Sequence, residues 1–470
     1  MALNAIIKHM IDFKNKKITI MGLGLHGGGL AVTKFLARMG AKITVTDLKN
    51  EKQLKPSIER LKAFRIKYVL GQHRLSDFQK ADLIIQNPGV RRDSIYLKAA
   101  RKNKIPIETD LSLFLKLCLA KNIIGITGTK GKSTTTALIY KILKKFRADS
   151  VLGGNIRISP LEFLKKIKKE TPVVLELSSW QLEGLAEHKL SPNFAVITNV
   201  LIDHLNTYKG FNDYRQAKEL IFKFQKANDV LVLNKDNKET KAMAQKSKSR
   251  IFWFSKNKLS SQENGCYLQN CWLIFKNKNK AFKILKLNNL KITGSHNLEN
   301  VLAACTLTMV FGVPVEIIRQ AVVNFKGLPG RMELIRELKG IKYYNDTTAT
   351  TPDAVMAALD TFKQKVVLLA GGTDKQLIFK DLAMAITKKV KTLILFKGTA
   401  TEKLLKELAK IKFNKSIIIV DSMPAAFGAA KNVLKKGDIF ILSPGAASFG
   451  IFINEFDRGA QFNREVKKIK

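Results

Sequence analysis

The sequence predicts an α/β protein made of three consecutive domains, each built on a mostly parallel sheet. Short β-branched runs alternate with helical stretches along the chain, which is the pattern of βαβ units. Two of the strands run into glycine-rich turns that open helices, as nucleotide-binding folds do. The length of 470 residues suits two to four domains, and the hydrophobic content of 46% is enough for packed cores.

The first predicted domain covers residues 1–107 and is Rossmann-like. A strand over 17–21 leads into MGLGLHGGGLAV, in which Gly22, Gly24 and Gly27 fit G-x-G-x-x-G. The next strand ends in Asp47, 20 residues after Gly27, where dinucleotide enzymes place the acid that meets a ribose hydroxyl. Taken alone, the motif predicts an NAD-dependent dehydrogenase, which we keep as a remote alternative.

The second predicted domain covers residues 108–327 and holds a P-loop-type ATP-binding sheet. Its strand and helix NIIGITGTKGKSTTTALIYKILKKF enclose a glycine turn, and Lys132 and Ser133 open the helix. In such a loop the lysine contacts the β- and γ-phosphates, and Ser133 or Thr134 holds Mg²⁺. The generic P-loop pattern wants glycine where this chain has Ile126, so a chance glycine-rich turn stays the alternative. Residues 250–287 are expected to form short antiparallel strands.

The third predicted domain covers residues 328–470 and is again Rossmann-like. Its expected strands are followed by turns and helices, in the segments VVLLAGGTDK, TLILFKG, SIIIVDS and DIFILSPGAASFG.

Composition narrows the class of protein. We find no run of 18 or more apolar residues and no secretory leader, so we expect a cytoplasmic protein without an integral membrane segment. The formal net charge is +44, from 82 basic and 38 acidic residues. The lysines are spread along the whole chain, which favours dispersed, solvated surface lysines. A nucleic-acid-binding NTPase is the second alternative function, and it would concentrate its basic residues. No nucleic-acid partner is therefore expected.

Several motifs resemble one family. The form T-G-T-x-G-K-S at Thr127 to Ser133 resembles the ATP loop of the Mur ligase superfamily, which also includes folylpolyglutamate synthases. Matching segments occur in all three predicted domains: ELSSWQLE, NVLIDHLNTY, YRQAKELIF, GSHNLENVLAA, GLPGRMEL and YYNDTTATTPDA. The resemblance implies an ATP-dependent ligase that phosphorylates a carboxylate and lets an amine attack the acyl phosphate.

The resemblance also implies roles for individual residues. The implied catalytic residues are Lys132, Glu176, His204 and Lys218, the last as a carbamylated lysine. The implied Mg²⁺ ligands, for two ions, are Ser133, Glu176, His204 and Lys218. The implied ATP site consists of Gly128, Thr129, Lys130, Gly131, Lys132, Ser133, Thr134, Asn297, Asn300, Arg331 and Asp346.

Within the superfamily, the glycine loop, the NPG turn and the C-terminal LSPGAASFGIFINEFDRG resemble the glutamate-adding members. The implied substrates are UDP-N-acetylmuramoyl-L-alanine and glutamate, handled by a monomer with ATP and Mg²⁺ and without NAD. The implied contacts of the UDP substrate are Gly22, Leu23, Gly24, Gly27, Asp47, Lys49, Asn87, Gly89 and Asn155. The implied glutamate contacts are Thr350, Lys375, Ser448 and Phe456.

The chain departs from the family pattern at two places. Asn206 stands where the family often has Asp, and the common N-D-S-K-A-T-N is here N-D-T-T-A-T-T, with Thr348 for Lys and Thr351 for Asn. The changed loop resembles that of a subgroup with members that add L-glutamate. We expect D-glutamate as the substrate, and L-glutamate is the alternative.

Overall fold

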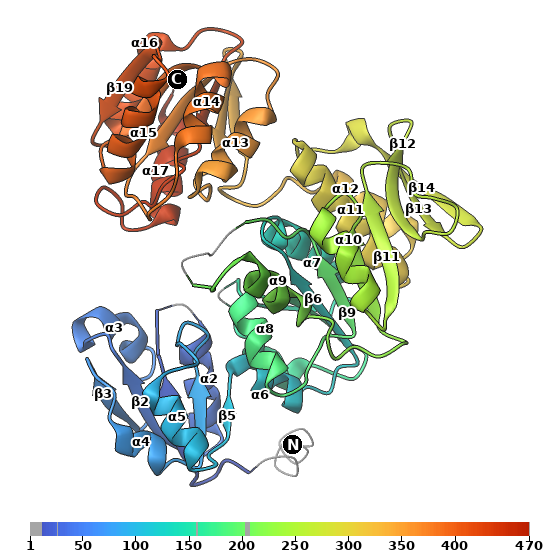
Figure 1. The fold of residues 1–470 in the computed structure, drawn as a ribbon, viewed down its shortest axis with the longest axis vertical. Helices are drawn as coiled ribbons and strands as arrows, with labels where there is room; N and C mark the ends of the chain where they lie inside the picture. Colours follow the sequence, from blue (N-terminus) through green and yellow to red (C-terminus); the bar gives the residue numbers. More distant parts are fainter. Residues whose placement is uncertain (1–11, 26, 157, 203–206, 470) are drawn as a thin grey trace. The chain divides into compact units, whose positions relative to one another are not determined.

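The computed structural model describes residues 12–25, 27–156, 158–202 and 207–469, which form three sheets flanked by helices (Figure 1). The chain divides into two compact units. The first unit runs up to Asn289 and includes Glu299–Val323, and the second contains Leu290–Leu298 and everything from Asn324 onward. The first two sheets belong to the first unit and the third sheet to the second. The predicted α/β class is confirmed.

The first sheet is parallel throughout, in the order β3-β2-β1-β4-β5. Its strands are β1 (Lys17–Met21), β2 (Lys42–Asp47), β3 (Ile66–Leu70), β4 (Leu83–Gln86) and β5 (Ile107–Glu108). Its helices are α2 (Gly28–Arg38), α3 (Glu51–Glu59), α4 (Leu75–Gln79), α5 (Ile95–Lys102) and α6 (Asp110–Leu117). The order reverses beside β1, so the glycine loop after β1 lies at the switch point where such sheets bind ligands.

The second sheet has the order β14-β13-β12-β11-β10-β9-β6-β8-β7. Its strands are β6 (Asn122–Thr127), β7 (Val151–Gly154), β8 (Pro172–Glu176), β9 (Phe194–Ile197), β10 (Val230–Asn234), β11 (Arg250–Ser255), β12 (Gly265–Gln269), β13 (Trp272–Asn277) and β14 (Lys280–Lys286). Its helices are α7 (Lys132–Phe146), α8 (Ser179–Ala186), α9 (Phe211–Glu219), α10 (Lys238–Met243), α11 (Ser295–Val310) and α12 (Val315–Val323), with 3₁₀ turns η1 (Pro160–Lys166), η2 (Ala244–Lys246) and η3 (Leu287–Asn289).

The edge of the second sheet differs in part from the expected run of antiparallel strands. β11 pairs in parallel with β10, and β12 pairs in parallel with β11. Only β12–β13 and β13–β14 are antiparallel. The alternating pattern of β11 fits either direction, so the sequence could not separate the two.

The third sheet has the order β15-β16-β20-β17-β18-β19, with β15 and β16 antiparallel and the other pairs parallel. Its strands are β15 (Glu333–Leu338), β16 (Ile341–Asn345), β17 (Val366–Gly371), β18 (Val390–Phe396), β19 (Ser416–Val420) and β20 (Ile439–Leu442). Its helices are α13 (Pro352–Asp360), α14 (Lys380–Lys389), α15 (Thr399–Lys410), α16 (Met423–Val433) and α17 (Glu455–Lys468).

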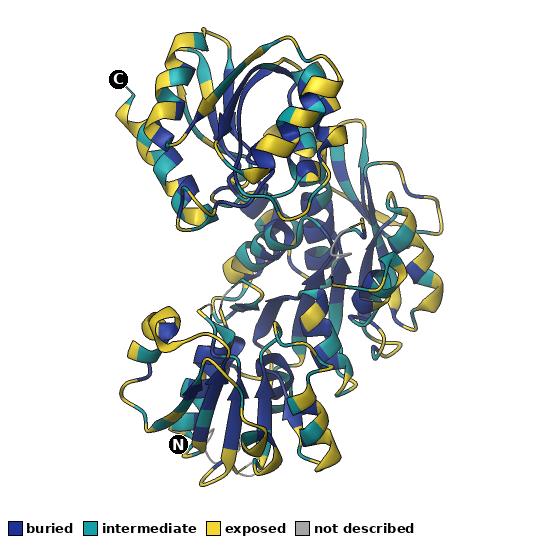
Figure 2. Ribbon diagram, turned by 60° about the vertical axis from the view of Figure 1, so that its left-hand side comes forward, coloured by how far each residue is buried: buried dark blue, intermediate teal, exposed yellow. Residues whose placement is uncertain are grey.

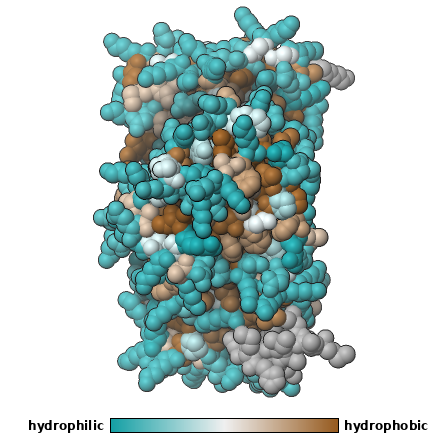
Figure 3. Space-filling view, turned by 90° about the vertical axis from the view of Figure 1, so that its right-hand side faces the viewer, coloured by the Kyte–Doolittle hydropathy of each residue, from teal (hydrophilic) through white to brown (hydrophobic). Residues whose placement is uncertain are grey.

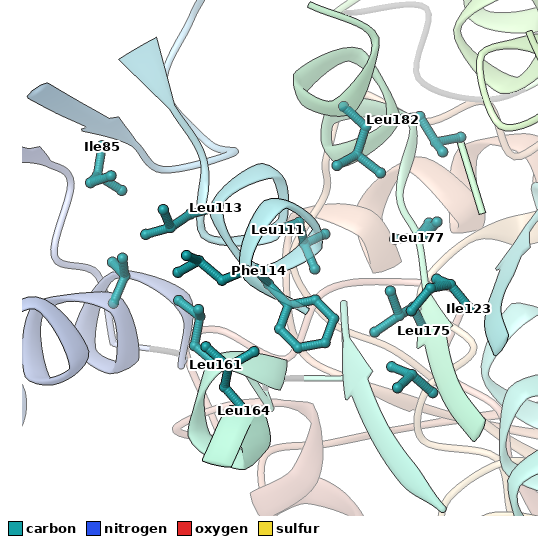
Figure 4. Packing of buried hydrophobic residues seen from close by; sticks show 14 of the residues in the cluster. Ile85, Leu111, Leu113, Phe114, Ile123, Leu161, Leu164, Leu175, Leu177 and Leu182 are labelled. Atoms are coloured by element: carbon teal, nitrogen blue, oxygen red, sulfur yellow. The ribbon is translucent and has the colours of Figure 1, made fainter. Parts of the chain in front are cut away.

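Burial follows the strands and the inner faces of the helices, while the outer faces of the helices are exposed (Figure 2). In the first unit, α6 carries apolar side chains in two directions. Leu113 lies toward Ile85 of the first sheet, and Phe114 lies toward Ile123 and Leu175 of the second (Figure 4). One continuous core therefore joins the first two sheets through α6.

Hydrophilic side chains cover most of the face seen in Figure 3, with apolar patches between them. No helix within the described ranges is long and apolar enough to cross a membrane.

Candidate active site

The glycine turn after β6 forms a tight loop at the start of α7. Gly128 has φ +146°, and a Cβ atom there would lie 1.9 Å from Thr198 Oγ1. Gly131, the N-cap of α7, has φ +84°, and its Cβ would lie 2.2 Å from Asn300 Oδ1. Both positions need glycine for conformation and for space. The loop therefore keeps its backbone at the helix N-terminus, which is where phosphate groups bind.

The end of β9 holds this loop from one side. Thr129 N donates to Asn199 O at 2.9 Å, and Lys130 N donates to Asn199 Oδ1 at 2.9 Å. Thr198 Oγ1 in turn donates to Lys130 O at 2.6 Å. Sequence reasoning assigned no role to Asn199, although it opens the NVLIDHLNTY segment. The sequence did offer one signal, because Thr198 and Asn199 are the first polar residues after a buried strand.

Lys132 supplies the positive charge of the loop. Its Nζ donates to Gly128 O at 2.9 Å and to Thr129 O at 3.0 Å. The ammonium thus lies over the loop's own backbone, next to the N-terminus of α7. An ammonium and a helix N-terminus at one point favour a polyphosphate.

Glu176 ends β8, which pairs with β6 so that Glu176 is the register partner of Ile126. Its carboxylate is buried: Oε1 accepts from Asn155 Nδ2 at 2.9 Å, while Oε2 has no hydrogen-bond partner. A buried carboxylate oxygen without a partner is costly unless a cation or water satisfies it. Mg²⁺ takes such an oxygen together with a hydroxyl, phosphate oxygens and water, so Glu176 and Ser133 fit this ion.

Within the described ranges, no three His, Cys, Asp or Glu side chains gather closely enough to hold a metal ion by themselves. Of the other predicted Mg²⁺ ligands, His204 lies outside the described residues. Lys218 is on α9 and is buried, and its Nζ lies 4.7 Å from the centroid of the Tyr214 ring. Tyr214 in turn donates to Thr129 Oγ1 at 3.2 Å. This chain of contacts links Lys218 to the phosphate loop.

The two asparagines predicted at the nucleotide both lie on α11. Asn300 Oδ1 accepts from Thr135 Oγ1 of α7 at 3.2 Å, and it is the atom that Gly131 must clear. Asn297, three residues earlier, is buried and donates through Nδ2 to Thr293 O at 2.8 Å. Asn300 therefore lies against the phosphate loop. Asn297 bonds to the residues that precede α11.

The glycine loop after β1 is held in a different way. Asp47 Oδ2 accepts from Leu23 N at 2.9 Å and from Gly24 N at 3.1 Å, and Oδ1 accepts from Lys49 N at 2.9 Å. On the other side, Asn87 Nδ2 donates to Gly22 O at 3.2 Å. Asp47 thus fixes the loop conformation. Asn155 donates to Glu176 Oε1, and its contact with the UDP substrate stays a prediction.

Two further glycines of this loop, Gly28 and Gly29, are crowded to different degrees. A Cβ on Gly29 would lie 2.4 Å from Leu23 O and 2.5 Å from Gly22 O. A Cβ on Gly28 would lie 3.2 Å from Asp110 Oδ2. Asp110 is itself buried, and desolvation raises its pKa to about 6.

The predicted glutamate site maps onto three loops of the third sheet. They follow the adjacent strands β16, β20 and β17. Gly445 N donates to Ala349 O at 2.8 Å, and Thr373 and Ala447 exchange two backbone hydrogen bonds of 3.0 Å. The loops that carry Thr350, Ser448 and Lys375 are therefore tied together through their backbones.

The predicted contacts in these loops differ in exposure. Ser448 is buried, Thr350 is half-buried, and Lys375 is exposed. Phe456, in the first turn of α17, is 48% exposed. The arrangement presents a hydroxyl, an ammonium and an aromatic ring from one end of the sheet.

Asp346 and its neighbours follow β16. Its Oδ1 accepts from Met332 N at 3.1 Å and Oδ2 from Ser443 Oγ at 2.8 Å, and desolvation raises its pKa to about 7. Arg331 lies close enough to oppose that shift through its charge. Thr348, which replaces the usual lysine, donates through Oγ1 to Gly330 O at 2.9 Å. No ammonium is present at this position of the loop.

Family models match each part of the chain. They are the N-terminal domain of MurD-like Mur ligases over residues 16–109, the Mur ligase middle domain over 126–308, and the Mur ligase glutamate ligase domain over 330–445. The chain belongs to the Mur ligase family. It is thus an ATP-dependent amide-bond-forming ligase, and this enzyme class decides against the dehydrogenase alternative.

Full-length relatives agree with this family. A UDP-N-acetylmuramoylalanine–D-glutamate ligase of Roseiflexus sp. (strain RS-1) is 42% identical over 97% of this chain and 99% of its own length. Proteins of the same name from Acetivibrio thermocellus and Borreliella afzelii are each 38% identical over 97% of this chain, and over 97% and 98% of their own lengths.

Solved Mur ligase structures share the fold. UDP-N-acetylmuramate-alanine ligase MurC from Thermotoga maritima has a TM-score of 0.61 at 22% identity and covers 97% of this chain and 100% of its own. MurF from Acinetobacter baumannii has a TM-score of 0.60 at 14% identity, with 98% of both chains covered.

Proposed function

We propose that this Mur ligase joins D-glutamate to UDP-N-acetylmuramoyl-L-alanine with ATP, as a step in peptidoglycan precursor synthesis. The observation that carries the proposal is the full-length relationship of 42% identity to an enzyme named for that reaction. The glycine loop of the first sheet, the phosphate loop of the second and the joined loops of the third supply places for its three substrates.

In the proposed reaction, the L-alanyl carboxylate takes the γ-phosphoryl group of ATP. The amine of glutamate then attacks the acyl phosphate: the C–N bond forms, the C–O bond to phosphate breaks, and the amine loses a proton. Lys132 and the N-terminus of α7 would stabilise negative charge on the transferring group. Mg²⁺, held by Glu176 and Ser133, would supply further charge neutralisation there.

The remaining assignments belong to the same proposal. Residues 1–107 would bind the UDP moiety through Gly22, Leu23, Gly24 and Gly27, and residues 108–327 would bind ATP with two Mg²⁺ ions. Residues 328–470 would bind glutamate through Thr350, Lys375, Ser448 and Phe456, and would contact ATP through Arg331 and Asp346. The enzyme would act as a cytoplasmic monomer without NAD or nucleic acid. Asn155 would contact the UDP substrate, and its amide would also orient Glu176, whose carboxylate it contacts.

The test is ADP release by the purified protein. Release is expected only when UDP-N-acetylmuramoyl-L-alanine and D-glutamate are both present, and the amide product should appear in equal amount. No release with both substrates would overturn the proposal. A marked preference for L-glutamate would replace D-glutamate by its isomer and would give the Thr348 substitution a functional meaning.

A further inference from the structure

Arg458, on α17, is an arginine with no exposed surface. Its Nη2 donates to Thr347 O at 2.9 Å, Nε donates to Thr347 Oγ1 at 3.2 Å, and Nη1 donates to Ala446 O at 3.3 Å. These three acceptors are neutral. The five N–H donors of a guanidinium lie in one rigid plane. A buried guanidinium that donates to several backbone and hydroxyl oxygens therefore fixes the distances between those oxygens.

The acceptors belong to two different loops of the proposed glutamate site. Thr347 lies in the loop after β16, three residues before Thr350. Ala446 lies in the loop after β20, two residues before Ser448. Arg458 therefore joins, through one side chain, the two loops that carry these predicted glutamate contacts.

The start of α17 is packed closely against the first of these loops. A Cβ on Gly459 would lie 2.6 Å from Thr347 Cγ2. Asn345 Nδ2 also donates to Gly459 O at 3.0 Å. These contacts leave the guanidinium little freedom to move away from Thr347.

Arg458 keeps its charge at neutral pH. Burial lowers its pKa to about 10, and the nearby Glu455 acts in the opposite direction. A cation in a medium of low dielectric constant acts over a longer distance than one in water. Its charge favours the dicarboxylate substrate that these loops are proposed to bind.

We propose that Arg458 is a positioning residue for the amino-acid substrate: its guanidinium sets the spacing of the Thr350 and Ser448 loops and adds positive charge behind them. This inference rests on the proposed function for the identity of that substrate. It assigns a role to Arg458, which the sequence resemblance left without one.

The test compares R458K with R464K, a matched control on an exposed position of the same helix. In R458K, lysine keeps the charge but cannot bridge three acceptors in one plane. We expect the KM for glutamate to rise about tenfold, while the KM for the UDP substrate changes by less than roughly twofold. R464K should match the wild type. An equal rise in both KM values would overturn the proposal, since it would indicate a merely structural role.

Hydrogen exchange provides a readout that does not depend on the substrate. In R458K, amides of residues 346–351 and 443–449 should exchange faster together, and those of the phosphate loop should not change. Unchanged exchange in both loops of folded R458K would overturn the inference. If R458K does not fold, T347V, which removes one acceptor and leaves the arginine, is measured in the same way. A wild-type protein inactive with both substrates would instead contradict the proposed function, and the exchange result would still decide the role of Arg458.

Discussion

Two glycine loops of the first unit share one local design and differ in charge. Both follow a parallel strand and open a helix, and in both a side chain from another strand end binds backbone N–H groups. The loop after β1 is held by the carboxylate of Asp47, and its eight residues from Gly22 to Gly29 contain no lysine or arginine. The loop after β6 is held by the neutral Asn199 and carries Lys130 and Lys132.

The comparison indicates that glycine spacing marks where a phosphate-bearing ligand meets a helix. The surrounding charges indicate whether the loop only binds that ligand or also takes part in its reaction. An acid among the backbone donors suits a loop that only holds a ligand. An ammonium with an unpartnered carboxylate oxygen nearby, as at Lys132 and Glu176, suits a loop where phosphoryl charge is neutralised during reaction.

Removing the ammonium of the second loop should have the largest effect. K132A should lower kcat by about 10³-fold with either glutamate isomer, because charge on the transferring phosphoryl group loses its cation. ADP release at saturating substrate measures this. K145A, an exposed lysine at the end of the same helix, should be as active as the wild type. A K132A enzyme that keeps more than a tenth of wild-type kcat would remove the distinction between the two loops.

The carboxylate of the second loop should come next. E176Q keeps an acceptor for Asn155 but loses the charge, so kcat should fall about 10²-fold and the Mg²⁺ concentration for half-maximal rate should rise. The rate is measured across a Mg²⁺ titration. An unchanged Mg²⁺ dependence would show that the unpartnered oxygen of Glu176 is not a ligand of this ion.

In the first loop, D47N should affect binding without affecting chemistry. An amide holds the backbone donors of Leu23, Gly24 and Lys49 less strongly than a carboxylate does, so the KM for the UDP substrate should rise about tenfold with kcat nearly unchanged. D82N is the matched control, because Asp82 accepts from Lys17 N at 2.8 Å, at the start of β1. A fall in kcat for D47N would place Asp47 in the reaction and break the comparison.

Two helical glycines test how tightly the first glycine loop packs against its helix. Helix propensity favours alanine at both Gly29 and Gly428, but only Gly29 is crowded by backbone oxygens, and a Cβ on Gly428 meets nothing within 4 Å. G29A should lower the free energy of unfolding by about 1–3 kcal/mol, whereas G428A should leave it unchanged or raise it by up to about 1 kcal/mol. Denaturant unfolding measures both. Equal behaviour of the two variants would contradict the steric explanation.

The last prediction concerns Asp346 and pH. Its folded-state pKa of about 7 exceeds the ordinary value of 3.8, so between these values the folded state binds more protons and wild-type stability falls as pH rises. D346N cannot titrate. Its free energy of unfolding, relative to the wild type, should therefore increase from pH 4 to pH 7 and level off above. A difference that stays constant across this range would show that Asp346 does not titrate in this way.

The sequence was sufficient for features that depend on local pattern. The α/β class followed from alternating strands and helices, and the family followed from contiguous motifs such as Thr127 to Ser133. The residue contacts of the site remain predictions, although the structure joins the loops of Thr350, Lys375 and Ser448.

Features that depend on distant contacts could not be predicted. Asn199 reaches the phosphate loop from another strand, and Arg458 bonds to Thr347, which lies 111 positions earlier. Parallel pairing of β11 was missed for the same reason. A single sequence contains no direct signal for such long-range partners.

The pairing between Thr373 and Ala447 uses only main-chain atoms. Any residue other than proline could keep those two hydrogen bonds, so side chains in these loops can be exchanged during evolution while the spacing of the site is preserved. At the proposed glutamate site, a scaffold of this kind would let the accepted amino acid change through a few substitutions. It also makes the third domain a suitable starting point for redesigning that choice.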